Sequence, residues 1–267
     1  MFFAPVSDIG VNKPVLDIRQ TEQSDLLWTW EHDGSNDTLV VCFSGIGKNT
    51  DPEPVLNFAS SATQGGRNSV LNIADPQRTW LNAEGLVEAI CGRAFQKAKE
   101  VGATRIVRLG HSMGGFSALV TADMLDAEVA IAFSPQLSID PAVVPSGNRW
   151  TEHRSKITDI NISNAADYMN ESCAYYVIFG THQREQPQRR HLPQGDNVKL
   201  FMIPGINHKS PQRIRKAAIL GSVIGLAAQK RTHRLRLEMQ AAFGEQSQIA
   251  PEDMPVAVRP FLKRTVS

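Results

Sequence analysis

Short apolar runs alternate with amphipathic and polar segments along most of the chain. The apolar runs are rich in Val, Ile, Leu and Phe and are followed by Gly, Pro, Asn or Asp, a pattern typical of buried strands that end in turns. Residues 84–101 instead carry their apolar side chains at helical spacing, and Gly102 ends this segment where a C-cap glycine belongs. Strands that alternate with helices predict a mostly parallel sheet covered on both faces, an α/β fold. The predicted strands are residues 25–31, 38–43, 69–73, 104–109, 127–133, 174–179 and 198–203, and the predicted helices are residues 84–101, 116–125 and 211–228.

The first two predicted strands lie on either side of a dense turn signal. Residues 32–37 read His-Asp-Gly-Ser-Asn-Asp, a composition that favours tight turns. The sequence therefore predicts that residues 25–31 and 38–43 form an antiparallel hairpin at the edge of the sheet. Residues up to about Gln23 show little periodicity, and we expect a loosely packed lead-in there.

A Gly-X-Ser-X-Gly motif joins the strand at residues 104–109 to the helix that follows it. The motif runs from Gly110 to Gly114 with Ser112 at its centre. In a strand-to-helix turn of this kind the serine hydroxyl projects above the sheet, and the flanking glycines allow the strand and helix backbones to pass close together. On the motif alone, an ordinary turn that contains a serine stays open as the alternative.

With this motif in this place, the chain resembles the α/β-hydrolase superfamily from about residue 38 to residue 228. The resemblance implies an α/β-hydrolase fold in a single domain, residues 1–267, with Ser112 as the nucleophile. It also implies a small cap over the active site, formed by the polar connection at residues 134–173, for which a plain loop with one crossover helix is the alternative. A tail at residues 245–267 follows, and the sequence assigns it no role.

The residues after the strand at residues 38–43 are Ser44, Gly45 and Ile46. Many α/β-hydrolases carry His-Gly-X at this place, and the backbone N–H of X is one donor of the oxyanion hole. Ser44 stands where the histidine would be, whereas Gly45 is kept. The resemblance therefore implies that the N–H groups of Ile46 and of Met113, the residue after the serine, bind the oxyanion.

The resemblance places the remaining catalytic residues after the motif, the acid first and then the histidine. His208 is the one histidine just past the last predicted strand, and it is the expected base. The loop after the strand at residues 174–179 holds Gln183 where the superfamily usually has aspartate, and Glu185 is its only carboxylate. Asp140 is the second candidate for the acid, and a site that lacks the acid altogether also stays open.

These residues predict a serine hydrolase that cleaves a carboxylic ester or thioester of a small molecule through an acyl-enzyme on Ser112. No cofactor is expected, and no metal either, because His, Cys, Asp and Glu do not occur at ligand spacing. An acyltransferase that uses the same triad is one alternative. A non-catalytic accessory or binding protein that kept the fold is the other.

The composition changes this interpretation little. Lys and Arg total 28 against 27 Asp and Glu, for a formal net charge of +1, so neither nucleic acid nor an anionic membrane is an expected partner. Three scattered cysteines and apolar runs far shorter than ~18 residues predict a cytoplasmic protein without disulfides or a membrane span. Arg184, Arg189, Arg190 and His191 cluster in and after the loop that holds the candidate acid. We expect a solvated loop there, and binding of an anionic substrate group such as a phosphate or carboxylate is the alternative. The sequence does not indicate the oligomeric state.

Overall fold

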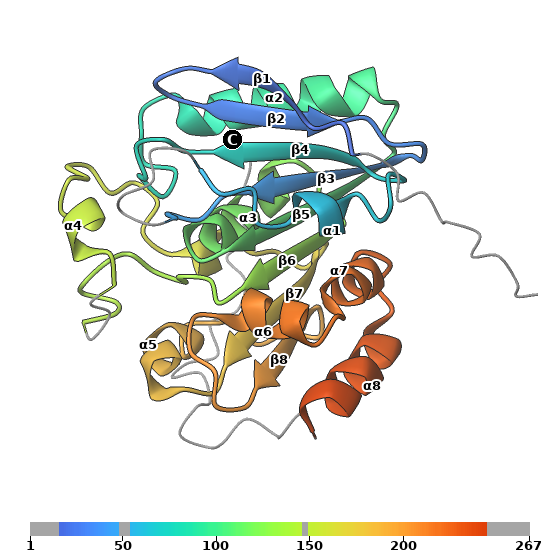
Figure 1. Ribbon diagram of the computed structural model, residues 1–267. Coiled ribbons are helices and arrows are strands. Elements are labelled where there is room, and N and C mark those ends of the chain that lie inside the picture. The colour runs from blue at the N-terminus through green and yellow to red at the C-terminus, as the bar shows by residue number, and fades with distance from the viewer. Residues whose placement is uncertain (1–15, 48–53, 146–148, 245–267) are drawn as a thin grey trace, which may run out of the picture.

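The computed structural model describes residues 16–47, 54–145 and 149–244. Within these ranges, eight strands form one sheet in the order β1-β2-β4-β3-β5-β6-β7-β8 (Figure 1). All the strands from β4 to β8 in this order are parallel, and β2 is antiparallel to its two neighbours. The strands are β1 (Arg19–Gln23), β2 (Trp28–His32), β3 (Thr38–Phe43), β4 (Ser69–Ala74), β5 (Arg105–His111), β6 (Val129–Phe133), β7 (Ala174–Gly180) and β8 (Val198–Ile203).

The sheet reverses its strand order between β3 and β5. β3, β4 and β6 are buried along their full length, as expected for parallel strands covered on both faces. β3 pairs with β4 on one side and with β5 on the other. Loops that leave the carboxyl ends of two strands at such a reversal diverge and open a crevice, the usual ligand site of an open α/β sheet. Ile46 follows β3 and Ser112 follows β5, so both lie at this crevice.

Helices cover both faces of the sheet, and each face buries its own apolar cluster (Figure 1). Leu86 of α2 and Phe116 of α3 belong to the cluster on one face. Ile214 of α6 and Val223 of α7 belong to the cluster on the other face, together with residues of α1 and α8. The α-helices are α1 (Ala59–Ala62), α2 (Leu86–Glu100), α3 (Met113–Met124), α4 (Thr151–Arg154), α5 (Gln186–Arg189), α6 (Ser210–Lys216), α7 (Leu220–Ala228) and α8 (Thr232–Phe243), and the 3₁₀ helices are η1 (Ala165–Tyr168) and η2 (Gln183–Glu185).

The edge of the sheet differs from the sequence prediction. β2 and β3 do not form a hairpin, because β2 pairs antiparallel with β4, and β3 lies on the far side of β4. The outermost position belongs to β1, where we expected a loose lead-in. β1 is polar and almost entirely exposed, so its sequence has no apolar alternation that would mark a strand.

The predicted helix at residues 211–228 is two helices, α6 and α7. Ala218 between them has a φ of 61°, a left-handed conformation that a continuing α-helix does not contain. Both helices still bury apolar residues in the same cluster, Ile214 from α6 and Val223 from α7. The apolar pattern therefore located the packed face and missed the break.

The connection at residues 134–173 contains α4 and η1, and between them its described residues follow an irregular path. Arg149 and Trp150 of this connection line the cavity described below. Its role as a cap stays a prediction. The tail at residues 245–267 lies outside the described residues. No helix in the described ranges is long and apolar enough to cross a lipid bilayer.

Candidate active site

Ser112 occupies a strained turn between β5 and α3. Its φ of 60° and ψ of −120° lie outside the regions that non-glycine residues favour, and strain of this kind is common at functional sites. A Cβ added at Gly114 would lie 2.2 Å from the carbonyl oxygen of Phe43, and one added at Gly110 would lie 2.0 Å from the carbonyl oxygen of Gly114. Only glycine fits at these two positions, and the close passage of β5, α3 and β3 presents Ser112 at the carboxyl edge of the sheet.

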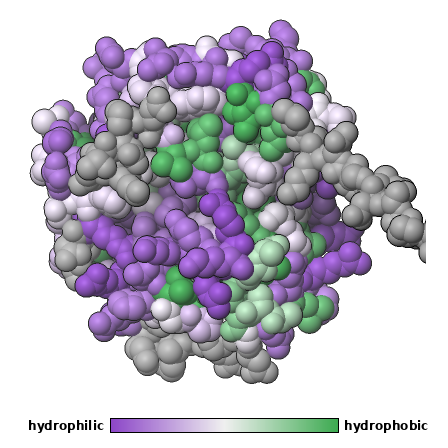
Figure 2. Space-filling model, viewed as in Figure 1, coloured by the Kyte–Doolittle hydropathy of each residue, from purple (hydrophilic) through white to green (hydrophobic). Residues whose placement is uncertain are grey.

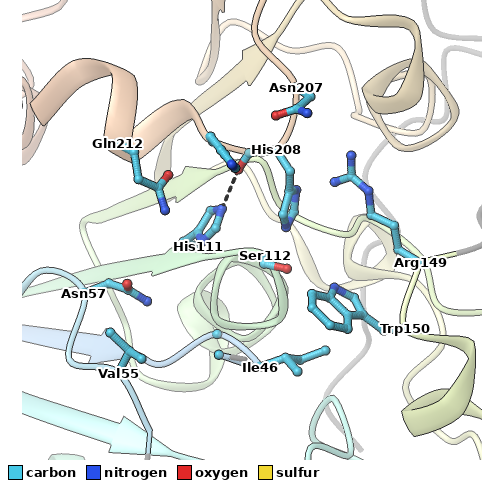
Figure 3. Close-up of a pocket in the computed structure, with 13 residues that line it drawn as sticks. Ile46, Val55, Asn57, His111, Ser112, Arg149, Trp150, Asn207, His208 and Gln212 are labelled. Carbon is cyan, nitrogen blue, oxygen red and sulfur yellow. Dashed lines mark hydrogen bonds between the residues drawn. The ribbon is translucent and has the colours of Figure 1, made fainter. Parts of the chain in front are cut away.

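His208 and Glu185 meet beside Ser112 from two other loops. His208 follows β8, Glu185 ends η2 after β7, and His208 Nδ1 lies 3.5 Å from Glu185 Oε2. This separation exceeds a normal hydrogen bond but is short enough for an electrostatic pair. Ser112 Oγ and His208 Nε2 are buried and have no hydrogen-bond partner among the described residues. Figure 3 shows the His208 ring facing the Ser112 hydroxyl.

The pKa values of this pair favour a neutral histidine and a charged carboxylate. Burial lowers the pKa of His208, the adjacent Glu185 offsets this effect only in part, and the positive charge of Arg149 lowers the pKa further. Burial opposes charge on Glu185, but His208 and Arg149 outweigh it and hold the pKa of this carboxyl below its usual value. A neutral imidazole beside a carboxylate is the form that accepts a proton from a serine hydroxyl.

Arg149 is the second partner of Glu185. Its Nη2 contacts Oε1 of the carboxylate, whereas Oε2 faces His208. The Glu185 side chain is 2% exposed, and that of Arg149, 26% exposed, reaches the cavity above Ser112. The buried carboxylate is therefore held between the guanidinium and the imidazole, which fixes its orientation.

His111, the residue before Ser112, fixes the loop that carries His208. Its Nε2 lies 2.8 Å from the backbone carbonyl oxygen of His208, and the two ring centroids are 4.7 Å apart (Figure 3). Burial, with the nearby His208 as the second cause, lowers the pKa of His111 to about 3, so this ring is neutral. Because a carbonyl oxygen only accepts, the single ring proton of His111 lies on Nε2, which donates to His208.

Two backbone N–H groups near Ser112 have no hydrogen-bond acceptor among the described residues. Met113 is the first residue of α3, where N–H groups have no acceptor within the helix. No backbone carbonyl in the described ranges accepts the N–H of Ile46. Arg78 Nε donates to the carbonyl oxygen of Ile46 at 3.1 Å and thereby holds the loop after β3. This loop passes close to the turn that carries Ser112, because a Cβ added at Gly45 would lie 3.1 Å from the carbonyl oxygen of His111.

A cavity of about 750 Å³ opens above Ser112. Its volume lies within the range of roughly 300–1,000 Å³ that is typical of ligand pockets. The lining combines Ser112, His111 and His208 with residues from the segment between β3 and α1, from the connection at residues 134–173 and from the start of α6 (Figure 3). Hydrophilic side chains dominate the face of the molecule seen in Figure 2.

No protein-family model and no curated protein sequence matches the chain. Its structure is similar to that of a capsule O-acetyltransferase of Neisseria meningitidis serogroup A, with a TM-score of 0.59, 14% sequence identity and coverage of 80% of this chain and 97% of that one. An esterase from Pyrococcus furiosus gives a TM-score of 0.56 at 13% identity, with 80% of this chain and 91% of that chain covered. Est1E from Butyrivibrio proteoclasticus gives 0.54 at 15% identity, with 84% and 99% covered. This protein has the α/β-hydrolase fold.

The α/β-hydrolase fold brings Ser112 and His208, which the sequence singled out, to one cavity and places Glu185, the third such residue, beside His208. Their catalytic roles, and those of the oxyanion-hole donors, stay predictions. Asp140, the second candidate for the acid, accepts the backbone N–H of Ala142 at 2.7 Å. No hydrogen bond or ion pair within the described residues joins Asp140 to His208. The geometry therefore favours Glu185 as the partner of the histidine.

Other parts of the site depart from what the sequence suggested. Arg189 does not lie in a solvated loop, because it is 2% exposed and its Nη1 donates to the carbonyl oxygen of Gly180 at 2.7 Å. Sequence reasoning also missed Arg149, since no local pattern marks it and only the fold brings it to Glu185. The contact of His111 with the loop that carries His208 was missed for the same reason. No group of three or more His, Cys, Asp and Glu side chains in the described part of the chain is arranged to hold a metal ion.

Proposed function

We propose that the protein is a serine hydrolase that cleaves carboxylic esters or thioesters of small molecules through an acyl-enzyme on Ser112. One observation carries this proposal: the unpaired Ser112 hydroxyl and the unpaired Nε2 of His208 border one cavity, with Glu185 behind the imidazole. A nucleophile, a base and a group that orients the base are the parts that acyl transfer by serine requires.

In the acylation step, His208 Nε2 takes the hydroxyl proton as Ser112 Oγ attacks the carbonyl carbon. The N–H groups of Ile46 and Met113 hold the negative charge that develops on the carbonyl oxygen. His208 then gives its proton to the leaving alcohol or thiol, and the carbonyl of the acyl-enzyme forms. His208 next takes a proton from a water molecule, which attacks this carbonyl carbon. The protonated His208 then returns the proton to Ser112 Oγ as the bond between Oγ and the acyl carbon breaks, and the carboxylic acid leaves. Glu185 orients the imidazole and stabilises its transient positive charge in both steps.

An acyltransferase is the second candidate, and the structural similarity to the capsule O-acetyltransferase favours it. The first half-reaction is the same, and an acceptor hydroxyl replaces water in the second. The two activities differ in their products, since a transferase forms a new ester when an alcohol is added. Product analysis with and without added glycerol separates them.

The proposal is tested with a fluorophosphonate probe and with hydrolysis of p-nitrophenyl acetate. We expect the wild-type protein to react with both and Ser112→Ala to react with neither, because no acyl-enzyme forms without Oγ. Ser117→Ala is the matched control, since Ser117 is a buried serine one turn further along α3 whose hydroxyl donates to the Met113 carbonyl. It should keep both reactions. If the folded wild-type protein reacts with neither reagent, the non-catalytic alternative is favoured.

A further inference from the structure

The described walls of the cavity carry several side chains that can hydrogen-bond and have no partner among the described residues. Asn57, Asn207 and Gln212 line the cavity, and their carboxamides make no hydrogen bond within the described residues. A carboxamide has two N–H donors and an acceptor oxygen, so it can pair with a group that both donates and accepts. Hydroxyl groups have this property.

Large apolar side chains are few in the same cavity. Among the described lining residues only Ile46, Val55 and Trp150 provide them, and Val55 is 43% exposed. A long acyl chain leaves water by packing along its length against apolar side chains, and three such residues offer it little surface. Arg149 and Lys209 bring positive charge, but the charge of Arg149 is paired with that of Glu185. The hydrogen-bonding groups of the lining therefore favour a polar ligand over a lipid.

Two carboxamides and two apolar side chains lie on different sides of Ser112. In Figure 3, Asn57 and Gln212 lie on the side of His111, with Val55 next to Asn57, whereas Ile46 and Trp150 lie below and beside the Ser112 hydroxyl, with Arg149 next to Trp150. The two carboxamides come from separate elements, Asn57 from the segment before α1 and Gln212 from α6. Two separate elements thus present hydrogen-bonding groups to the same cavity, and two apolar side chains lie next to the nucleophile.

We propose that the substrate of the serine hydrolase is an ester of a short acyl group with a polyhydroxylated ring, such as a sugar. This inference rests on the proposed function, because it assigns the two sides of the cavity relative to Ser112. The short acyl group lies against Ile46 and Trp150, and Asn57 and Gln212 bind hydroxyls of the ring. A few fixed hydrogen bonds of this kind orient a ligand over the reacting atoms.

Three acetyl esters that differ only in the alcohol test the inference. p-Nitrophenyl acetate reports reaction at Ser112 with an activated leaving group. Methyl 6-O-acetyl-glucopyranoside and cyclohexyl acetate both carry a six-membered ring, with and without hydroxyls. We expect kcat/KM for the acetyl glucoside to exceed that for cyclohexyl acetate by roughly tenfold or more, since at least two hydrogen bonds distinguish them.

Two variants locate the effect. Gln212→Met and Asn57→Leu keep the size of the side chain and remove its carboxamide. In each variant the ratio of kcat/KM for the acetyl glucoside to that for cyclohexyl acetate should fall roughly three- to tenfold, through a higher KM for the glucoside. Gln240→Met makes the same change on the exposed face of α8 and should leave the ratio as it is.

The outcomes separate this inference from the proposed function. If the wild-type protein cleaves p-nitrophenyl acetate but uses cyclohexyl acetate as well as the glucoside, the assignment of the substrate is overturned and the serine hydrolase stands. The same holds if neither variant changes the ratio. If p-nitrophenyl acetate is not cleaved at all, the proposed function fails, and the assignment of its substrate fails with it.

Discussion

At the scale of single residues, Arg149 places a positive charge beside both members of the His208–Glu185 pair. Its charge contributes to the lowered pKa of His208 and helps to keep Glu185 ionised. His208 accepts a proton only when it is neutral, so activity is lost as the pH falls through its pKa. Arg149→Met removes the repulsion that disfavours the imidazolium, and we expect the acidic limb of the kcat/KM profile to move to higher pH. Hydrolysis of p-nitrophenyl acetate between about pH 4 and pH 8 measures this shift.

A matched control for Arg149→Met is Arg184→Met, which removes an exposed arginine from η2, the turn that also carries Glu185. The acidic limb of the kcat/KM profile of Arg184→Met should coincide with that of the wild-type protein. If Arg149→Met lowers activity and leaves the limb in place, Arg149 acts through packing alone and the electrostatic argument fails.

At the scale of elements, the crossing of β3, β5 and α3 depends on Gly114. A Cβ there would meet the backbone of Phe43 at 2.2 Å, and backbone atoms cannot move aside as a flexible side chain can. We expect Gly114→Ala to lower the free energy of unfolding by at least roughly 1–3 kcal/mol, as overpacking does. Gly92→Ala is the control, since a Cβ at this position in α2 meets nothing within 4 Å. It should stabilise the protein by about 0.5–1 kcal/mol, and urea titration of both variants gives the two signs.

The strands β3 to β8 follow from the sequence because each contains an apolar run of strand length. β2 falls within the predicted strand at residues 25–31 and one residue beyond it, although the residues that it buries are Thr29, Glu31 and His32. Which strands pair does not follow, since β2 lies beside β4 through contacts between segments that are far apart in sequence. The break at Ala218 was also hidden, because no glycine or proline marks it.

In the candidate site, too, the sequence marks some residues and only the fold reveals the others. Ser112 and His208 stand out by motif and by chain order, and Glu185 stands out as the one carboxylate in its loop. Arg149 and His111 act through contacts with other loops, Arg149 through the side chain of Glu185 and His111 through the backbone of His208. Contacts of this kind exist only after the sheet has brought the loops together, so a local pattern does not indicate them.

At the scale of the whole molecule, strain and unpaired polar groups gather at the carboxyl edge of the sheet, and stability comes from the two apolar clusters. Ser112 combines a left-handed φ with an unpaired hydroxyl, and both nitrogens of His208 lack a hydrogen bond within the described residues. The clusters on the two faces bury the central strands from both sides. Sites that hold functional groups in unfavourable states depend on such a surrounding structure.

Arg108 is an unpaired polar group that lies within the sheet and not at its carboxyl edge. Arg108 of β5 is fully buried, and none of its side-chain nitrogens has a hydrogen-bond partner within the described residues, although the Phe43 ring centre lies 5.8 Å from the guanidinium carbon. Burial lowers the pKa of Arg108 to about 9, below its value in the unfolded chain. The cost of burying the charge is therefore present in full at every pH below about 9. We expect Arg108→Met to raise the free energy of unfolding near neutral pH by roughly 1–4 kcal/mol, because an apolar side chain of similar length needs no partner. Urea titration measures the gain. Arg234→Met is the control, because Arg234 is an exposed residue of α8 and its replacement should change the free energy of unfolding by less than about 0.5 kcal/mol. A loss of stability in Arg108→Met would mean that buried water or the aromatic ring compensates the charge, and that Arg108 stabilises the sheet.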